Sequence, residues 1–383
     1  MSPITAAPKL VWDNILTLPY YQPGKPIEEV ERELGISGII KLASNENPLG
    51  PSPKASEVIR QMATEVHRYP DATAYYLKEK MSRKLSVDTE QLGFGNGADE
   101  IITFVAAAFI HPEDEALIPS PTFIRYETSV QMMGGKPVIL PLNNWHIDLQ
   151  VVLDNINEKT KMIFLCNPNN PTGSIIRKGE VDAFLEKVPK HIIIVFDEAY
   201  KEYVNDDAYP DTLEYLKRND RRMIILRTFS KIYGLAGLRI GYGITTPELA
   251  DILKLVRPPF NASAVAQAAA AAALDDDEHV RRSRTVNEEG KKYISKAFED
   301  LGLDYTPSHS NFIFFDSKRD GVELFNAMLR EGVIIRPLTI GEKNSFLRVS
   351  IGTMDENKRF VETLERVLKK VSPSAPKRGM SHA

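Results

Sequence analysis

The sequence predicts an α/β fold with a mostly parallel sheet, followed by a second, smaller α+β unit. In the middle of the chain, short apolar runs alternate with amphipathic stretches, which is typical of βαβ units. The pattern changes after a long helix-like segment at 278–301, because strand-like runs then flank a single helix. With 383 residues, the chain is long enough to bury a large core and to form two domains.

The larger domain is expected to contain buried parallel strands with helices between and around them. The strand-like apolar runs lie at 116–119, 137–140, 161–165, 191–196 and 223–226. The amphipathic stretches between them lie at 123–133, 178–188 and 213–217. Further helices are expected at 55–67, 75–85, 98–110, 261–274 and 278–301. Continuous apolar runs of this length indicate strands that are buried in a parallel sheet.

The smaller unit is expected to follow a boundary at Pro258 and Pro259, because two prolines stop a helix. Its strands are predicted at 311–315, 333–336 and 346–351, and its helices at 322–330 and 355–370. The tail at 372–383 is rich in Pro, Ser, Lys and Arg, and we expect it to be disordered.

Composition excludes several classes of partner. The formal net charge of -4 gives no general attraction to nucleic acid or to an anionic membrane. No apolar run is long enough to span a bilayer, and residues 1–19 lack the basic and apolar regions of a signal peptide. We therefore expect neither a nucleic acid partner nor a membrane partner.

Cysteine and histidine usage indicates a reducing compartment and no metal. Cys166 is the only cysteine, so no intrachain disulfide can form, and a cytoplasmic location is expected. Cys166 ends an apolar run and is interpreted as a buried small hydrophobe. The seven histidines show no HxH or HxxxH spacing, so no metal site is predicted.

A lysine turn at 228–239 follows the apolar run at 223–226. The carboxyl end of such a strand is where open α/β sheets bind ligands. Partial desolvation there would lower the pKa of Lys231 and make it a Schiff-base nucleophile. Thr228, Ser230 and Arg239 are candidates for holding a phosphate beside it. On spacing alone, a surface lysine after a strand remains the alternative.

Polar residues also follow other strand-like runs. The glycine-rich segment 93–97 precedes a helix whose first N–H groups suit a phosphate, although it lacks the full dinucleotide-binding fingerprint. The segment 166–173 contains two Asn-Pro pairs and presents several amides, including Asn170. Asp197 and Tyr200 follow the run at 191–196, where a helix cap is the alternative role for Asp197.

Together these residues match the chemical needs of pyridoxal phosphate. A lysine can form the Schiff base, and an aspartate such as Asp197 can keep the pyridine nitrogen protonated. Tyr200 and Asn170 can donate hydrogen bonds to the phenolic oxygen of the ring. An arginine and a helix N-terminus can hold the phosphate.

At this point the chain resembles a known family. The motifs that carry the resemblance lie at 41–48, 69–71, 95–100, 167–173, 197–200, 228–239 and 347–353. They are similar, in order, to those of the histidinol-phosphate aminotransferases, in the class-II branch of the fold-type-I aminotransferases that depend on pyridoxal phosphate. The resemblance runs from about residue 18 to residue 368. It implies a three-layer α/β/α large domain, a smaller α+β domain and a homodimer.

The resemblance also implies a domain division and a set of cofactor-binding residues. Residues 1–50 would form an N-terminal arm and part of the small domain. Residues 51–258 would form the large cofactor-binding domain, and residues 259–371 the small C-terminal domain. Lys231, Asp197 and Tyr200 would be catalytic. The implied contacts to pyridoxal phosphate are the backbone of Ala98 and Asp99, the ring of Phe123, and the side chains of Asn170, Asp197, Tyr200, Thr228, Ser230, Lys231 and Arg239.

For the substrate, the resemblance points to Arg348, Arg336, Asn170 and Tyr21, with Tyr20 as a weaker choice than Tyr21. A surface role is the alternative for both arginines. Two subunits share each site in this family, and Tyr69 would reach the phosphate of the neighbour's cofactor.

The implied reaction converts L-histidinol phosphate and 2-oxoglutarate to imidazole-acetol phosphate and L-glutamate, in histidine biosynthesis. An aromatic amino-acid aminotransferase is the nearest alternative, since a carboxylate can replace the substrate phosphate. A phosphothreonine decarboxylase-like enzyme, which would release CO2, is a more distant alternative. A non-enzymatic regulator with an aminotransferase-like domain is disfavoured, because only about 40 residues precede the first motif, too few for a DNA-binding domain.

Overall fold

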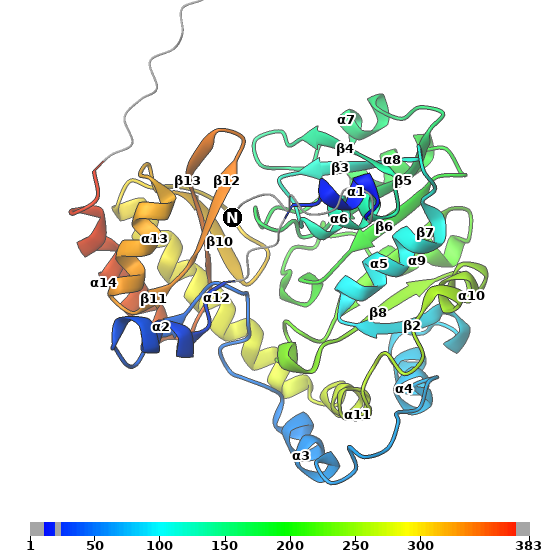
Figure 1. Cartoon of the computed structure of the whole chain (residues 1–383), viewed down its shortest axis with the longest axis horizontal. Coiled ribbons are helices and arrows are strands. Elements are labelled where there is room, and N and C mark those ends of the chain that lie inside the picture. The colour runs from blue at the N-terminus through cyan, green and yellow to red at the C-terminus, as the bar shows by residue number, and fades with distance from the viewer. Residues whose placement is uncertain (1–10, 20–23, 373–383) are drawn as a thin grey trace, which may run out of the picture.

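A seven-stranded sheet forms the centre of the larger unit in the computed structural model, which describes residues 11–19 and 24–372 (Figure 1). Its strand order is β2-β8-β7-β6-β5-β3-β4. The strands are β2 (Leu92–Asn96), β3 (Glu115–Ser120), β4 (Lys136–Pro141), β5 (Thr160–Cys166), β6 (Ile193–Asp197), β7 (Arg222–Thr228) and β8 (Ile240–Thr245). The five strands predicted from apolar runs correspond to β3, β4, β5, β6 and β7.

The sheet is parallel except at β8, which pairs antiparallel with both β2 and β7. Alternate residues of each strand face opposite cores. In β6, Ile194 and Phe196 belong to one apolar cluster, and Ile193 and Val195 belong to the other. Both faces of the strand are therefore buried, which explains its continuous apolar sequence. The predicted mostly parallel sheet is confirmed.

Helices cover both faces of this sheet and give three layers, as predicted. The helices that pack against one face are α5 (Ala98–Phe109), α6 (Arg125–Met132) and α10 (Pro247–Val256). Those that contribute to the opposite core are α4 (Tyr75–Leu85), α7 (Leu149–Asp154), α8 (Lys178–Lys187), α9 (Thr212–Arg218) and α11 (Ala264–Ala273). The other helical elements of this part are α1 (Asp13–Leu16), α3 (Pro53–Met62), η1 (Thr89–Gln91), η2 (Lys201–Tyr203) and η3 (Ala236–Leu238).

Strands β2 and β8 were not predicted, because glycines interrupt their apolar pattern. The structure gives a reason for these glycines. A Cβ atom on Gly241 of β8 would lie 2.3 Å from the backbone nitrogen of Ala98, at the start of α5. Glycine therefore lets the N-terminus of α5 approach the sheet closely, although glycine has a low intrinsic preference for β-strands.

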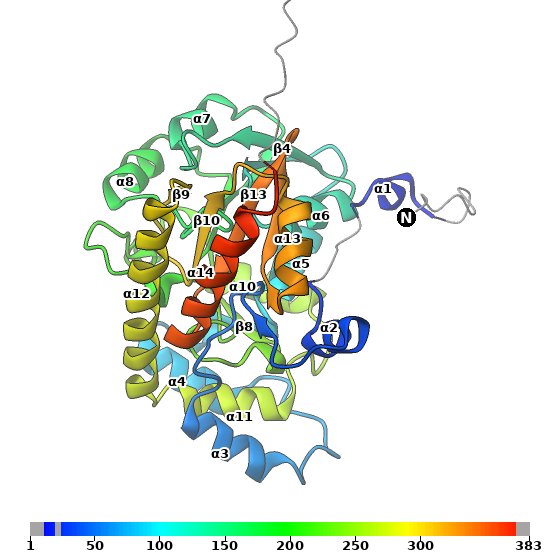
Figure 2. The same ribbon diagram turned by 90° about the vertical axis from the view of Figure 1, so that its left-hand side faces the viewer.

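A four-stranded antiparallel sheet of order β12-β13-β10-β9 forms the smaller unit. Its strands are β9 (Asp304–Thr306), β10 (Phe312–Asp316), β12 (Arg336–Ile340) and β13 (Lys343–Ser350). Its helices are α2 (Ile27–Leu34), α12 (Asp277–Asp300), α13 (Gly321–Arg330) and α14 (Met354–Leu368). Helix α12 extends from the level of α11 to the smaller sheet (Figure 2).

The N-terminal segment is tied to the smaller unit by a short parallel pair, in which β1 (Ile40–Lys41) pairs with β11 (Val333–Ile334). The following residues cross to the larger unit, where Ser52 N–H donates to the carbonyl of Tyr233. The segment 41–52 therefore bridges the two units and passes the lysine turn.

The domain bounds at 50, 258 and 371 stay predictions. Helix α11 follows the predicted boundary at Pro258 and Pro259, yet it packs against α3 and α4 of the larger unit. The predicted disordered tail lies outside the described residues, apart from Ser372. Within residues 11–19 and 24–372, no helix combines the length and apolar character that crossing a bilayer requires. In the same ranges, no three His, Cys, Asp or Glu side chains are grouped to hold a metal ion.

Candidate active site

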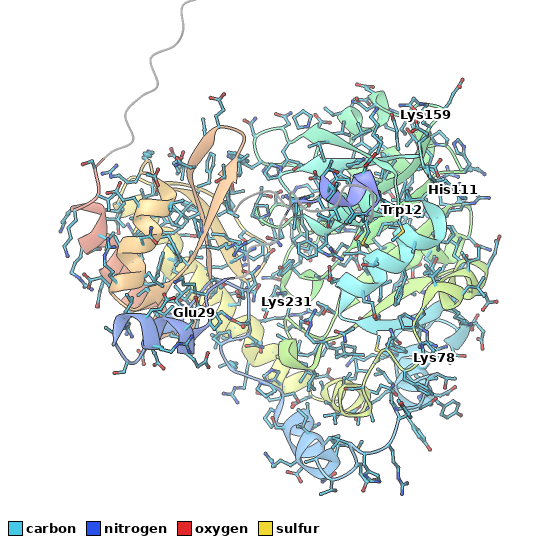
Figure 3. All side chains as sticks on the ribbon, viewed as in Figure 1. Trp12, Glu29, Lys78, His111, Lys159 and Lys231 are labelled. Atoms are coloured by element: carbon cyan, nitrogen blue, oxygen red, sulfur yellow. The ribbon has the colours of Figure 1, made fainter. Side chains whose placement is uncertain are left out.

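A cavity of about 210 Å³ lies between the carboxyl edge of the larger sheet and the smaller unit. Figure 3 labels Lys231 at this junction. The predicted site residues that line the cavity are Ala98, Asp99, Phe123, Asn170, Asp197, Tyr200, Thr228, Ser230, Lys231, Arg239, Arg336 and Arg348. They come from separate segments, and the carboxyl ends of β5, β6 and β7 bring several of them together. Tyr21 lies outside the described residues, as does Tyr20.

Tyr69, which was predicted to belong to the site, is a described residue that does not line the cavity. Its side chain is 84% exposed, and its ring stacks on that of Phe260 with centroids 4.9 Å apart. The cavity of this subunit therefore does not include it.

Lys231 is partly buried and lines the cavity, so it is not an exposed surface lysine. Its Nζ donates a hydrogen bond to the carbonyl of Ser44 at 3.2 Å and lies 5.6 Å from the ring centroid of Tyr200. Burial, reinforced by the positive charges of Arg348 and Arg239, lowers its pKa from 10.5 to about 8. A larger share of this amine is therefore neutral near physiological pH than in an ordinary lysine, and a neutral amine is the nucleophilic form.

The turn that carries Lys231 is packed against the N-terminal segment. Gly234 has a φ of 70°, and a Cβ atom there would lie 2.0 Å from the carbonyl oxygen of Gly50. Asn47 donates to the carbonyl of Ile232 at 2.7 Å. These contacts fix the backbone on the C-terminal side of Lys231.

Asp197 ends β6 with its carboxylate buried against the cavity. Oδ2 accepts a hydrogen bond from the hydroxyl of Tyr126 at 2.7 Å, and Oδ1 accepts one from the backbone N–H of Ala199 at 3.0 Å. Burial raises the pKa of Asp197, and these two hydrogen bonds oppose the rise. Among the described residues, no ion pair within 4.0 Å neutralises the carboxylate, so the site calls for a cationic group from a ligand.

Asn170 and Arg348 form a direct contact. Arg348 Nη1 donates to Asn170 Oδ1 at 2.6 Å, and Nη2 donates to the carbonyl of Ala43 at 2.7 Å. The guanidinium also lies 5.2 Å from the ring centroid of Phe312. Because the amide oxygen of Asn170 is occupied by the arginine, its NH2 group is left to act as a donor.

The other predicted arginine, Arg336, begins β12 and lines the same cavity. Its Nη1 would lie 3.9 Å from a Cβ atom on Gly24, so the guanidinium is close to the N-terminal segment. Arg336 and Arg348 pair across β12 and β13 in register. Two positive charges from paired strands of the smaller sheet therefore line the cavity, whereas Asp197 comes from the larger sheet.

A group of hydrogen-bond donors lines the cavity at the start of α5. Gly97, at a φ of 78°, precedes the helix, and a Cβ atom there would lie 2.6 Å from Nη2 of Arg239. The N–H groups of Ala98 and Asp99 are in the first helical turn and have no partner within the helix. Together with Thr228 and Ser230, which line the same end, they suit a phosphate. The side chain of Asp99 pairs instead with Arg125, with Oδ1 to Nε at 2.7 Å.

Several residues of the cavity were missed by sequence reasoning. They are Gly24, Ala43, Ser44, Asn45, Gly97, Ile102, Tyr126, Cys166 and Ala199. Tyr126 lies in the first turn of α6, Phe123 precedes that helix, and their rings meet edge to face at 5.8 Å. Cys166 is buried, as predicted, and burial raises the pKa of its thiol to about 12, which argues against a nucleophilic role.

Comparison with known proteins assigns the family. The model of the family "Aminotransferase class I and II" matches residues 37–364. The chain belongs to this family. A histidinol-phosphate aminotransferase of Moorella thermoacetica is 48% identical over 366 residues, which cover 96% of this chain and 95% of the relative. One of Caldicellulosiruptor saccharolyticus is 46% identical over 354 residues, covering 92% of this chain and 99% of the relative.

A solved structure resembles this aminotransferase over almost its whole length. The histidinol-phosphate aminotransferase from Sinorhizobium meliloti, in complex with pyridoxal-5'-phosphate, superposes with a TM-score of 0.87 at 28% identity. The match covers 95% of this chain and 99% of that structure. The predicted resemblance, the fold-type-I class and the enzyme class of an aminotransferase are thereby confirmed.

Proposed function

We propose that this aminotransferase uses pyridoxal phosphate to convert L-histidinol phosphate and 2-oxoglutarate to imidazole-acetol phosphate and L-glutamate, in histidine biosynthesis. The observation that carries the substrate assignment is the pair Arg336 and Arg348, which line one cavity with Lys231. Two guanidinium groups suit a phosphate, which carries more negative charge than a carboxylate. The names of the relatives at 46–48% identity support the same substrate.

The donor set of the cavity matches pyridoxal phosphate. Lys231 would supply the amine for a covalent link to the cofactor, and Asp197 would supply the negative charge for a protonated ring nitrogen. The start of α5, Thr228, Ser230 and Arg239 would hold the phosphate, and Phe123 would stack on the ring. Tyr200 and Asn170 would donate hydrogen bonds to the ring oxygen. When bound, pyridoxal phosphate withdraws electrons from the amino donor and makes its α-hydrogen acidic.

Residues of the chain would bind the amino donor and transfer its α-proton. Arg336, Arg348 and Tyr21 would bind the phosphate-bearing end of the donor and orient its α-carbon. Lys231, once its nitrogen is free, would remove the α-proton as a general base. Its lowered pKa suits this role, because a base works best when its pKa is near the working pH. The amino group would be passed to 2-oxoglutarate in a second half-reaction, so ping-pong kinetics are expected.

The substrate assignment is tested by comparing kcat/KM for L-histidinol phosphate and L-phenylalanine, with 2-oxoglutarate as the acceptor. We expect histidinol phosphate to be the better substrate. We also expect Arg336→Gln to lower kcat/KM for it about tenfold more than for phenylalanine, because the dianion loses more from the removal of one arginine. A preference for phenylalanine would identify an aromatic amino-acid aminotransferase, and release of CO2 from phosphothreonine without an acceptor would identify a decarboxylase.

The pKa of Lys231 predicts how the cofactor-free protein captures pyridoxal phosphate. Only the neutral amine attacks the aldehyde, so the rate rises as the pH passes the pKa and then levels off. With a pKa of about 8, we expect the rate constant to level off above about pH 9. Stopped-flow absorbance from pH 6 to pH 11 measures this, with Lys231→Ala as the control that forms no covalent link. A rate that still rises beyond pH 10 would indicate an ordinary lysine.

We further propose a homodimer in which Tyr69 reaches the phosphate site of the partner. The exposure of Tyr69 and Phe260 supports this, as does that of nearby large apolar side chains such as Leu255 and Tyr76. The small-molecule substrates and the single cysteine, which is buried, support the cytoplasm as its location.

A mixing experiment tests the shared site. Lys231→Ala and Tyr69→Ala homodimers are each expected to have low activity. A mixed dimer contains one site with both substitutions and one site with neither, so activity should return to as much as half of that of the wild type in the mixed species. Mixing Lys231→Ala with Asp197→Asn is the control, because both residues come from one subunit. If Tyr69 serves its own subunit, mixing will restore nothing.

A further inference from the structure

A chain of hydrogen bonds leads from the smaller sheet to Tyr200. The backbone N–H of Asn45 donates to Ser350 Oγ at 2.8 Å, and Ser350 Oγ donates to Asn45 Oδ1 at 2.9 Å. Asn45 Nδ2 then donates to the hydroxyl oxygen of Tyr200 at 2.9 Å. All three residues are buried. Because Ser350 occupies the amide oxygen, the NH2 group of Asn45 is the group that faces Tyr200.

The hydroxyl oxygen of Tyr200 is the acceptor in its hydrogen bond with Asn45. A phenolic hydroxyl that accepts a hydrogen bond keeps its own proton for another acceptor. Among the described residues, none accepts a hydrogen bond from the hydroxyl of Tyr200. Since Tyr200 lines the cavity, its proton is directed to whatever acceptor the ligand presents there.

Asn45 is held firmly by the smaller unit. Its backbone has a φ of 56°, a left-handed conformation that asparagine tolerates better than most residues. Its carbonyl accepts from Asn311 Nδ2 at 3.0 Å, and Asn311 immediately precedes β10. Ser350 ends β13, whereas Tyr200 follows β6 of the larger sheet. The amide of Asn45 therefore joins the smaller sheet to a residue of the larger sheet inside the cavity.

We infer that Asn45 is a positioning residue that directs the hydroxyl proton of Tyr200 to the ring oxygen of pyridoxal phosphate, and that Ser350 fixes the orientation of its amide. The inference rests on the proposed function, because the ring oxygen is the acceptor. Arg348 acts in parallel on Asn170, whose amide oxygen it occupies at 2.6 Å. Both donors to the ring oxygen are thus oriented by residues of the smaller unit or its bridging segment.

Other titratable groups also act on Tyr200 and must be held constant in a test. They are Arg348 on β13, Asp197 at the end of β6, Cys166 at the end of β5, and Lys231, whose Nζ lies over the ring. Burial raises the pKa of Tyr200 to about 12, so the hydroxyl stays protonated and remains a donor. A substitution at Asn45 leaves all four groups in place.

The test measures the pH dependence of cofactor absorbance in the enzyme reconstituted with pyridoxal phosphate. A donor at the ring oxygen stabilises its negative charge and thereby lowers the pKa of the C=N nitrogen that joins the cofactor to Lys231. Asn45→Asp keeps the size of the side chain but offers acceptors only, so Tyr200 would donate to it instead. We expect the apparent pKa to rise by about one pH unit.

A double-substitution cycle separates this effect from the new charge. In the Tyr200→Phe background, Asn45→Asp should raise the apparent pKa clearly less, because no hydroxyl proton is left to redirect. Ser350→Ala, which releases the side-chain amide of Asn45, should also raise the apparent pKa of the cofactor. If Asn45→Asp does not fold, the Ser350→Ala variant is used in its place. Asn357→Ala is the control, since Asn357 is a buried amide that binds the backbone of Gly352 and does not line the cavity, and it should leave the titration unchanged.

Equal shifts in both backgrounds, or no shift in the Tyr200-containing enzyme, would overturn the inference alone. A wild-type protein that binds no pyridoxal phosphate would instead overturn the proposed function on which the inference rests.

Discussion

Lys231→Ala is expected to abolish transamination and to lower kcat by at least about 10⁴-fold. In the proposed mechanism, the substitution removes both the amine that would bind the cofactor and the base that would take the α-proton. Burial and two neighbouring arginines lower the pKa of this amine to about 8, and no other described lysine lines the cavity. The measurement is kcat with saturating histidinol phosphate and 2-oxoglutarate, together with the mass of the borohydride-reduced chain.

A matched control is Lys201→Ala. Lys201 also follows β6 at the carboxyl edge of the sheet, but its Nζ lies 3.9 Å from Glu198 and 3.8 Å from Asp211, outside the cavity. This variant should keep nearly full activity and still retain the cofactor after reduction. If Lys231→Ala kept normal turnover, or if reduction fixed the cofactor to another lysine, the assignment of Lys231 would be wrong.

Asp197→Asn is expected to lower kcat/KM by about 10²- to 10⁴-fold, the loss that follows when one partner of a buried charge pair is removed. The variant keeps the size of the side chain and an oxygen to accept from Ala199. It removes the negative charge that would keep the ring nitrogen protonated, so the cofactor would withdraw electrons less strongly. Steady-state kinetics and an absorbance titration of cofactor binding measure both effects.

Asp211→Asn provides the control for this substitution. Asp211 caps the N-terminus of α9 through the N–H of Leu213, and asparagine caps a helix about as well as aspartate. Its kinetics should match those of the wild type. A comparable loss in both variants would mean that the effect of Asp197→Asn is on folding, and unchanged kinetics in Asp197→Asn would contradict the role of this carboxylate.

The parallel core and the site residues at its strand ends were accessible from the sequence for the same physical reason. Strands buried on both faces are continuous apolar runs, so their C-terminal ends, and with them Asp197 and Thr228, can be located directly. The glycine-rich β2 and β8 could not be found in this way, because the close approach of α5 in space determines their composition.

The residues that orient the site were harder to predict. Tyr126 reaches Asp197 from a helix 71 positions earlier, and Ser350 reaches Asn45 across 305 positions. Neither pair has a local pattern, since each contact depends on how β3, β6 and the smaller sheet are placed. Asn45 lies in the motif at 41–48 that supports the family resemblance, but only its contact with Tyr200 reveals a role.

A single half-reaction tests the central claim most directly. The purified, cofactor-loaded enzyme is mixed with L-histidinol phosphate in the absence of any acceptor, and the products are quantified by mass spectrometry. We predict one equivalent of imidazole-acetol phosphate per subunit, with the amino group retained by the enzyme until 2-oxoglutarate is added and then recovered in L-glutamate. No ketone from histidinol phosphate, alongside full conversion of L-phenylalanine under the same conditions, would contradict the proposed function.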